Sequence, residues 1–444
     1  MNQELTKICI IGIWHQGAVA AACMTEVGYY VIGVDFDQTR INDLNKGKAP
    51  LYEPGLDDLL KNGIMSGRLS FTTSLSEGLS ETNQILMMLD TPVDENDEAD
   101  LTDIFRVAAE MAPYIFPRSL LLVTAQVPIG TCDQIADIIL KTNPLSDIKI
   151  AYCPENLRLG QAIDRFKNPP LPVIGANDEE TLDRAEKLLS VFPVSWKRVN
   201  LRTAEMTKHA LNAFLAVSIS FANELGNLCD AVGADGLQVG QALRIEPRIG
   251  SKAMIFPGLG FSGGTLARDM KTLIHLSRKY DVAIPLINGA WLSNQQQNRL
   301  VVKTLQKVFG YLDSLNVCVL GLTYKPDTST LRRSVSIEII AELISQGAHV
   351  TAYDPKADRN ELENYTGFKI CQDAYSAADG SDVLILITPW SEFKNLDFKK
   401  IYSMMEKPVI FDTQNILDKD MLSNIGFSYF GIGRGIAKPQ RGVN

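Results

Sequence analysis

The opening segment of the chain places the tightest constraint on its fold, because a buried strand, a glycine turn, a helix and a second strand follow one another. We predict the first strand over residues 7–12, which are apolar, rich in β-branched side chains and ended by glycine. A helical pattern covers 18–27, and a second strand over 30–35 ends in an acid. This order is typical of the βαβ unit that binds a dinucleotide at the amino terminus of its helix. A Rossmann-like fold is therefore expected at the start of the chain.

Two glycines and one acid carry the predicted cofactor site. Gly12 and Gly17 occupy the outer glycine positions of a G-x-G-x-x-G turn, and Asp35 follows Gly12 by about 20 residues, as does an acid that binds the adenosine ribose. This acid favours NAD, because it would repel the 2′-phosphate of NADP. Trp14 replaces the middle glycine, which normally lets the backbone meet the pyrophosphate. If the indole points outward, the amides can still bind NAD; if it points inward, it fills the phosphate site and the unit is merely structural.

The alternation of strands and helices along the chain predicts three regions. Residues 1–200 are expected to form a parallel, doubly wound NAD-binding domain. Residues 201–309 form a central helical region for dimerisation, in which 204–232 make one long helix without proline. A new alternation gives a second, smaller sheet over 310–444. The predicted fold class is α/β, with two doubly wound, Rossmann-like parallel-sheet domains joined by a long central helix.

Composition limits the partners. The 444 residues are 45% hydrophobic and carry a net charge of −9, so nucleic acid is not an expected ligand. No apolar run reaches the roughly 18–20 residues that a membrane span needs. The N-terminus enters a strand at once and leaves no room for a signal peptide, and the seven cysteines are scattered. We expect a cytoplasmic protein with reduced cysteines, and we predict no metal site.

Polar residues follow the predicted strands at the edge where open α/β sheets bind ligands, notably Gln126 and Glu155. On the long helix, Lys208 and Asn212 are spaced i, i+4 and share one face. The loop GFSGGTLARD, at 260–269, presents Thr265 beside three glycines. An unassisted threonine hydroxyl is a poor nucleophile, so the role of Thr265 is the central question of this site.

Taken together and in order, these motifs resemble the UDP-glucose/GDP-mannose dehydrogenase family over essentially the whole chain. The matching segments are Glu53-Pro-Gly55 for E-P-G-L, Asp90-Thr91-Pro92 for P-T-P, Ala125–Pro128 for S-T-V-P, Pro154–Arg158 for P-E-x-L-R-E-G, Lys208 and Asn212 for K-x-x-x-N, Gly258–Asp269 for G-x-G-F-G-G-S-C-x-x-K-D, and Lys325-Pro326 with Arg332 and Ser334 for K-P…D-x-R-x-S.

The resemblance implies NAD as cofactor, a homodimer, and an anionic nucleotide sugar, with a UDP-hexose as the family average, bound between the domains. The implied catalytic residues are Glu155, Lys208, Asn212, Thr265 and Asp269. The implied NAD-binding residues are Gly12, Trp14, Gly17, Asp35, Thr91, Pro92, Gln126 and Arg332. The implied sugar-binding residues are Glu155, Leu157, Lys208, Asn212, Arg248, Gly258, Phe261, Gly263 and Lys325.

Several departures from the family pattern bear on the reaction. The family oxidises a sugar C6 alcohol to a carboxylate with two NAD, through a cysteine thioester. Thr265 stands where that cysteine is expected, and Trp14, Gln126, Leu159 and Arg268 also depart from the pattern. A thiol ionises near neutral pH and leaves an acyl carbon readily, whereas a threonine hydroxyl does neither.

Three functions remain open on this evidence. The first is redox chemistry limited to the alcohol and aldehyde levels. The second is a pseudoenzyme that binds nucleotide sugar or NAD without turnover. The third is full oxidation to the uronic acid through a hydrated aldehyde, with Asp269 as base. Cys153 is a conceivable displaced nucleophile, but a strand-end cysteine more often packs.

Overall fold

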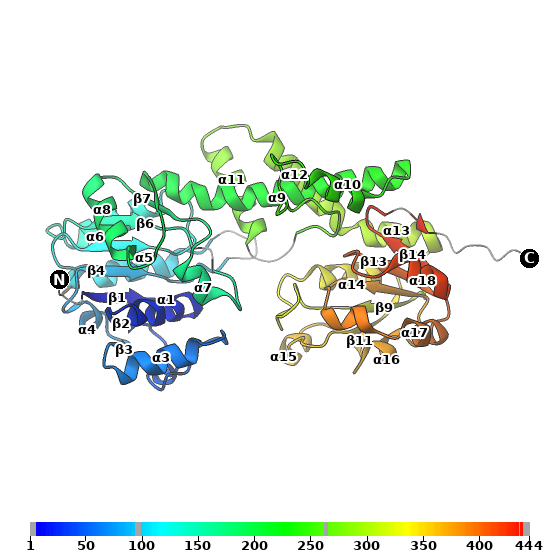
Figure 1. The fold of residues 1–444 in the computed structure, drawn as a ribbon, viewed down its shortest axis with the longest axis horizontal. Helices are drawn as coiled ribbons and strands as arrows, with labels where there is room; N and C mark the ends of the chain where they lie inside the picture. Colours follow the sequence, from blue (N-terminus) through cyan, green and yellow to red (C-terminus); the bar gives the residue numbers. More distant parts are fainter. Residues whose placement is uncertain (1–5, 94–98, 156, 262–264, 435, 438–444) are drawn as a thin grey trace, which may run out of the picture. The chain divides into compact units, whose positions relative to one another are not determined.

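The structure is a computed structural model that describes residues 6–93, 99–155, 157–261, 265–434 and 436–437. The chain divides into two compact units, Met1–Leu211 (unit 1) and Asn212–Asn444 (unit 2). Each unit holds one mainly parallel sheet covered by helices (Figure 1). The predicted α/β class with two Rossmann-like domains and a long central helix is confirmed.

In the described part of unit 1, an eight-stranded sheet runs in the order β3-β2-β1-β4-β5-β6-β7-β8, and only the β6–β7 pair is antiparallel. Both faces of the sheet are buried: along β1, Ile8 and Ile10 enter one core while Cys9 and Ile11 enter the other. This burial explains the continuous apolar runs that predicted the strands. The strands are β1 (Lys7–Ile11), β2 (Tyr30–Val34), β3 (Leu69–Thr72), β4 (Gln84–Met87), β5 (Leu120–Val123), β6 (Lys149–Tyr152), β7 (Val173–Ala176) and β8 (Lys197–Val199).

The helices of unit 1 begin in two ways. Asp37, Ser74 and Asp178 cap α2, α4 and α8 with their side chains, whereas α1 and α6 have no side-chain cap. The helical elements are α1 (His15–Glu26), α2 (Gln38–Leu44), α3 (Leu56–Met65), α4 (Leu75–Leu79), α5 (Thr102–Met111), η1 (Ala112–Tyr114), α6 (Thr131–Thr142), α7 (Ala162–Lys167) and α8 (Glu179–Leu189).

The long helix α9 (Leu201–Val232) starts in unit 1 and ends in unit 2. It is followed by α10 (Gly236–Leu243), α11 (Leu266–Lys279), α12 (Pro285–Asn298) and α13 (Leu300–Phe309). The sequence pattern predicts one helix over about 289–307, but the structure has two helices there, which meet at Arg299. None of the described helices is long and apolar enough to cross a bilayer.

The sheet of unit 2 repeats the strand order of unit 1. Its described strands run β11-β10-β9-β12-β13-β14-β15, and β14–β15 is the antiparallel pair. They are β9 (Asn316–Leu320), β10 (His349–Tyr353), β11 (Phe368–Ile370), β12 (Val383–Leu386), β13 (Val409–Asp412), β14 (Ser428–Gly431) and β15 (Ile436–Ala437). The accompanying helical elements are α14 (Val335–Ser345), α15 (Arg359–Leu362), α16 (Ala374–Ala378), η2 (Ser391–Asn395), α17 (Phe398–Met404) and α18 (Lys419–Ile425).

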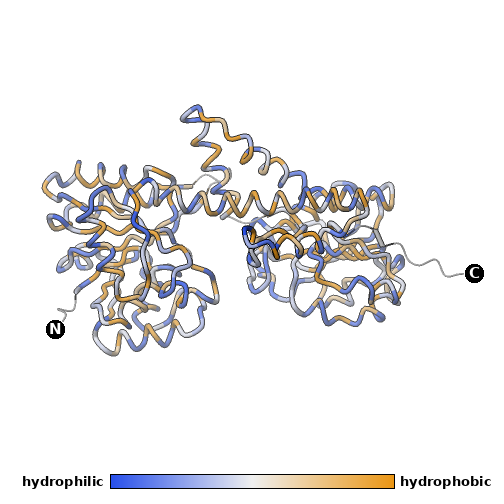
Figure 2. The backbone as a smooth tube through the Cα atoms, turned by 45° about the horizontal axis from the view of Figure 1, so that its top comes forward, coloured by the Kyte–Doolittle hydropathy of each residue, from blue (hydrophilic) through white to orange (hydrophobic). Residues whose placement is uncertain are grey.

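The first turn of each sheet is built alike. The amide of Ile13, after Gly12, donates to the Asp35 carboxylate, and the amide of Leu322, after Gly321, donates to Asp354. In each case an acid at the end of the second strand fixes the turn that ends the first. Hydrophobic segments run through the interior of each unit, with hydrophilic segments in the surrounding helices and loops (Figure 2).

Candidate active site

The glycine turn after β1 has the backbone that a dinucleotide requires. Gly12 has φ +92°, and a Cβ there would meet the Leu89 amide nitrogen at 2.8 Å; a Cβ at Gly17 would meet the Gly12 carbonyl oxygen at 1.9 Å. Side chains are therefore excluded at both positions. The first amides of a helix have no intrahelical acceptor, and α1 has no side-chain cap to use them. The amino terminus of α1 thus suits a pyrophosphate.

Trp14 adopts its place without strain. Its φ of −82° and ψ of −155° are extended values open to any residue, and the Arg40 guanidinium lies 4.7 Å from the indole centroid. Arg40 also pairs with Asp35, at 2.7 Å between Nη1 and Oδ1. Because the indole stacks on Arg40, the Trp14 side chain is directed toward the end of β2, where a ribose-binding acid is expected.

The first turns of α9 hold the loop that follows β5. The buried Glu205 carboxylate accepts hydrogen bonds from the amides of Gly130 (2.6 Å) and Cys132 (3.0 Å), and a ring nitrogen of His209 lies 2.9 Å from the Val127 carbonyl oxygen. Burial raises the pKa of Glu205 above its ordinary value, although the amides act in the opposite direction. Glu205 thus replaces the missing cap of α6.

The loops after β4 and β5 are also joined. The Thr91 hydroxyl donates to the Gln126 carbonyl oxygen at 2.8 Å. Gln126 is buried and Pro92 is exposed. These predicted cofactor residues therefore line one edge of the unit 1 sheet.

Lys208 and Glu155 meet at the end of β6. The buried Lys208 ammonium donates to the Glu155 carbonyl oxygen at 2.5 Å, and the Glu155 carboxylate accepts the amide of Leu157. Next to them, burial raises the pKa of Cys153 to about 12, with the Glu155 charge contributing. A thiol of this pKa is neutral at pH 7, which favours a packing role for Cys153 over that of a displaced nucleophile.

Glu53, from the Glu53-Pro-Gly55 segment, fixes the loop that follows Glu155. Its buried carboxylate accepts the amides of Gly160 (2.8 Å) and Ala162 (2.7 Å) and lies 3.2 Å from Nε2 of His15. His15 is buried as well, which agrees with a packing role. The start of α1 and the start of α7 are therefore held by one carboxylate.

In unit 2, the predicted site residues lie on α9 and α11. The Asn212 side-chain amide donates to the Asp269 carboxylate, and Arg268 Nε lies 3.7 Å from the other carboxylate oxygen. Asp269 is fully buried. Thr265 is the residue before α11; it is exposed and makes no side-chain capping hydrogen bond. The Thr265 hydroxyl thus has no capping role at the start of α11.

Buried side-chain amides hold the backbone that leads into the glycine loop. Asn223 accepts the amide of Gly258, and Asn294 makes hydrogen bonds with both the amide and the carbonyl oxygen of Phe261. Gln297 donates to the Gly258 carbonyl oxygen at 2.7 Å. Gly263 lies outside the described residues. The backbone at Gly258 and Phe261 is therefore fixed by side chains of α9 and α12.

The remaining predicted residues lie elsewhere in unit 2. Arg248 is exposed and pairs with Glu246 at 2.8 Å. Lys325 is half-buried, with Nζ 5.4 Å from the Tyr324 ring centroid, and Arg332 is exposed. Among the described residues, no contact joins any two of Arg248, Lys325 and Arg332.

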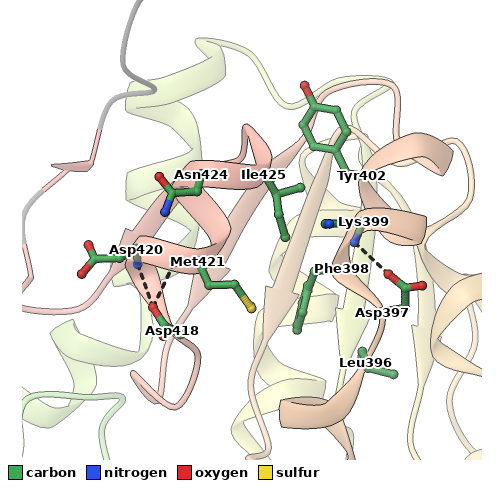
Figure 3. Close-up of a pocket in the computed structure, with 10 residues that line it drawn as sticks. All are labelled: Leu396, Asp397, Phe398, Lys399, Tyr402, Asp418, Asp420, Met421, Asn424 and Ile425. Atoms are coloured by element: carbon green, nitrogen blue, oxygen red, sulfur yellow. Dashed lines mark hydrogen bonds between the residues drawn. The ribbon is translucent and has the colours of Figure 1, made fainter.

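A large hollow in unit 2 is a different feature. It has a volume of about 990 Å³ and contains none of the predicted site residues (Figure 3). Side chains of α17 and α18 and of the segments before them line it: Leu396, Asp397, Phe398, Lys399, Tyr402, Asp418, Asp420, Met421, Asn424 and Ile425.

Sequence reasoning missed the residues that position the site. Arg40, Glu205, Asn223 and Asn294 were not predicted. A signal existed for α9, because the polar residues Glu205, Lys208, His209 and Asn212 recur at i, i+3, i+4 and i+7 and so lie on one side of the helix. Such a polar stripe indicates a buried side of the helix whose side chains form hydrogen bonds.

Three successive segments of the chain match domain models of the same protein family. Residues 6–192 match the NAD binding domain of the UDP-glucose/GDP-mannose dehydrogenase family, residues 202–296 its central domain, and residues 318–419 its UDP binding domain. The UDP-glucose 6-dehydrogenase of Rhizobium meliloti is 35% identical over 436 residues, which cover 96% of this chain and 99% of that protein. The corresponding protein of Pseudomonas aeruginosa is 32% identical over 442 residues, with 96% and 97% covered.

Solved structures of nucleotide-sugar dehydrogenases have the same fold as this chain. A UDP-glucose dehydrogenase from Pyrobaculum islandicum superposes with a TM-score of 0.87 at 28% identity, covering 97% of this chain and 98% of that one. A UDP-D-ManNAc dehydrogenase from Pyrococcus horikoshii gives 0.84 at 25% identity, covering 97% and 99%. With the NAD-compatible glycine turn, the Lys208 and Asn212 pair and the three matched domains, the chain belongs to the UDP-glucose/GDP-mannose dehydrogenase family.

Proposed function

We propose that the protein is an NAD-dependent oxidoreductase that acts on a nucleotide sugar, with a UDP-hexose as first candidate, and that it works between the alcohol and aldehyde levels. Its relatives include UDP-glucose 6-dehydrogenases. One observation carries the proposal: Lys208, Asn212 and Asp269 keep buried, hydrogen-bonded positions, whereas Thr265 is exposed and uncapped. The retained groups suit alcohol chemistry, and the altered one belongs to the thioester step.

In this proposal NAD, when bound, supplies the acceptor for a hydride from the sugar C6. The amides at the start of α1 and the Asp35 carboxylate hold its pyrophosphate and adenosine ribose. The Lys208 ammonium donates to the oxygen on which charge develops as the hydride leaves. The hydroxyl proton passes to the Glu155 carboxylate. The alcohol thereby loses one hydride and one proton and becomes an aldehyde.

Asn212 and Asp269 complete the set. We assign to Asn212 a second hydrogen bond to the same oxygen, by its place one helical turn after Lys208. Asp269 accepts from the Asn212 amide and so orients it. Asn212 is then a catalytic residue and Asp269 a positioning residue.

Thr265 sets the limit of the reaction. Its hydroxyl is far harder to ionise than a thiol, and no described hydrogen bond at the start of α11 engages it. Without a covalent acyl intermediate, the second oxidation has no route comparable to a thioester. The proposed product is therefore the aldehyde, or the starting sugar again if NAD serves only for transient oxidation.

The test is a product balance. The enzyme is incubated with NAD and a panel of nucleotide sugars, NADH is followed by absorbance, and the product is analysed by mass. We expect at most one NADH per sugar and an aldehyde product. Two NADH per sugar with a carboxylate product would refute this proposal and support full oxidation through a hydrated aldehyde, with Asp269 as base.

A second candidate is binding without turnover. It is favoured by Leu159, which is 41% exposed where the family pattern has a glutamate, so a further acidic group is absent from the loop after β6. A pseudoenzyme would show ligand-dependent stabilisation, which follows RT ln(1 + [L]/Kd), and no NADH with any sugar. Both candidates bind these ligands and should be stabilised by them in a thermal-shift titration. NADH formation distinguishes the two, because only the oxidoreductase produces it.

We further propose that the protein is a homodimer assembled through α9 and is cytoplasmic. Phe214, Phe221 and Leu228 are spaced by seven residues and are 70%, 52% and 62% exposed, so α9 carries an apolar stripe on its outer face. A second copy of the same helix fits this stripe. The seven cysteines are free, in keeping with a reducing compartment.

A further inference from the structure

The replacement of the middle glycine by Trp14 changes the chemistry of the predicted nucleotide site. At Gly12 and Gly17 the backbone excludes any Cβ, but at residue 14 the backbone conformation is open to every residue. The fold thus accepts the indole without distortion of the turn. The residue is also 37% exposed, so a planar apolar face remains accessible at the place where a nucleotide is expected.

The indole is held in place by a chain of contacts. Arg40, on α2, stacks at 4.7 Å from the indole centroid, and its Nη1 lies 2.7 Å from Asp35 Oδ1. Asp35 is itself fixed, because its carboxylate accepts the amides of Ile13 (2.9 Å) and Asp37 (3.1 Å). The row Trp14–Arg40–Asp35 therefore leads from the turn that is predicted to bind the pyrophosphate to the acid that is predicted to bind the ribose.

In a dinucleotide-binding βαβ unit, the adenosine half of the cofactor is expected beside the acid that ends the second strand, which is Asp35 here. Bases stack on aromatic side chains and on guanidinium planes, and a stacked arrangement of the two offers both kinds of surface. The Arg40–Asp35 ion pair also prevents the arginine from leaving the stack freely.

We propose that Trp14 and Arg40 form a stacking platform for the adenosine half of NAD, so that this chain replaces close backbone contact at the middle glycine with side-chain stacking. The inference rests on the proposed use of NAD and deepens it. Trp14 and Arg40 are then specificity-determining residues for the cofactor. The nicotinamide half, which lies beyond the pyrophosphate, does not depend on them.

The experiment is calorimetric titration of the full chain with NAD, ADP-ribose and nicotinamide mononucleotide. Trp14→Ala keeps a compatible backbone and removes the ring, Trp14→Phe keeps a smaller ring, and Arg40→Ala removes the stacked cation. The matched control is Lys400→Ala, which removes a cation 4.3 Å from the Tyr375 ring in unit 2. Melting curves of each variant establish that it folds.

We expect Trp14→Ala and Arg40→Ala to weaken NAD and ADP-ribose about tenfold or more, in line with the loss of a stacked aromatic under a base. Trp14→Phe should lose less, the mononucleotide should be unaffected, and Lys400→Ala should match the unmodified protein. Unchanged or tighter binding by Trp14→Ala overturns the platform, while the proposed function stands. No binding of NAD or ADP-ribose by any variant, the unmodified protein included, removes NAD use itself and this inference with it.

Discussion

Removing the Thr265 hydroxyl tests whether this side chain reacts or only lines the site. We expect Thr265→Ala to change the rate of NADH formation by tenfold at most, since one neutral hydrogen bond is worth about 0.5–1.5 kcal/mol. Lys208→Met keeps the buried volume but loses the ammonium, and should slow the reaction about 100- to 1,000-fold, as for a donor at a developing oxyanion. Steady-state kinetics measures both. A dead Thr265→Ala enzyme, with an ester-linked sugar trapped on the unmodified protein, would instead identify Thr265 as the nucleophile.

The converse substitution restores the thiol. Thr265→Cys places a group that ionises near neutral pH just before α11, where the exposed position of residue 265 leaves it accessible. We expect a second NADH per sugar and a carboxylate product, detected by absorbance and mass analysis. Thr265→Ser is the control, because it keeps a hydroxyl and should remain at the aldehyde level. Identical products from the cysteine and serine variants would mean that the other departures, such as Gln126 and Leu159, also block the second step.

At the scale of elements, Glu205 links α9 to α6 and gives stability a defined pH dependence. Its pKa is raised in the folded protein, so folding binds a proton and the stabilisation by this residue falls as pH rises from about 4.3, the ordinary value, through the raised pKa. Glu205→Gln has no such proton. We expect the free energy of unfolding of the variant to be about 1–3 kcal/mol lower, because one amide loses its acceptor. The difference between the two proteins should narrow as pH rises from the ordinary to the raised pKa of Glu205, and should stay constant above it.

Urea denaturation of both proteins between about pH 4 and pH 8 measures this difference. Burial also raises the pKa of Asp412. This residue is present in both proteins, so its contribution to the pH dependence cancels in the comparison. A deficit that widens with rising pH would contradict the assigned direction.

The elements themselves were largely predictable from sequence, and the side-chain geometry was not. Strands such as β1 and β9 are buried on both faces, so their sequences are continuous apolar runs that predict strands. The helix α9 was predictable because no proline interrupts it. The break at Arg299 was missed because no proline or glycine marks it. The candidate residues Lys208, Asn212 and Asp269 were found through family register, but the direction of the Trp14 indole depends on Arg40, a residue of another element that no local pattern relates to it.

At the scale of the whole molecule, the apolar stripe of α9 predicts self-association. We expect light scattering to give the mass of a dimer, and Phe221→Glu with Leu228→Glu to give a monomer, because two charges on each copy would face one another in an apolar interface. Tyr311→Glu, at a residue that is 92% exposed in the segment before β9, is the control and should remain dimeric. A monomeric unmodified protein would remove the dimer proposal.

Trp14 also has an optical consequence. The chain holds four tryptophans, and Trp14 is the one that is more than a third exposed, whereas Trp196, Trp291 and Trp390 are half-buried or buried. A collisional quencher dissolved in the buffer should therefore reach Trp14 first and leave the other indoles comparatively bright. A nucleotide lying against the ring would shield it, and the loss of quenching would report occupancy of the cofactor site in real time, without a label and without turnover. The residue that breaks the glycine fingerprint would then serve as an intrinsic fluorescent reporter of the site it alters.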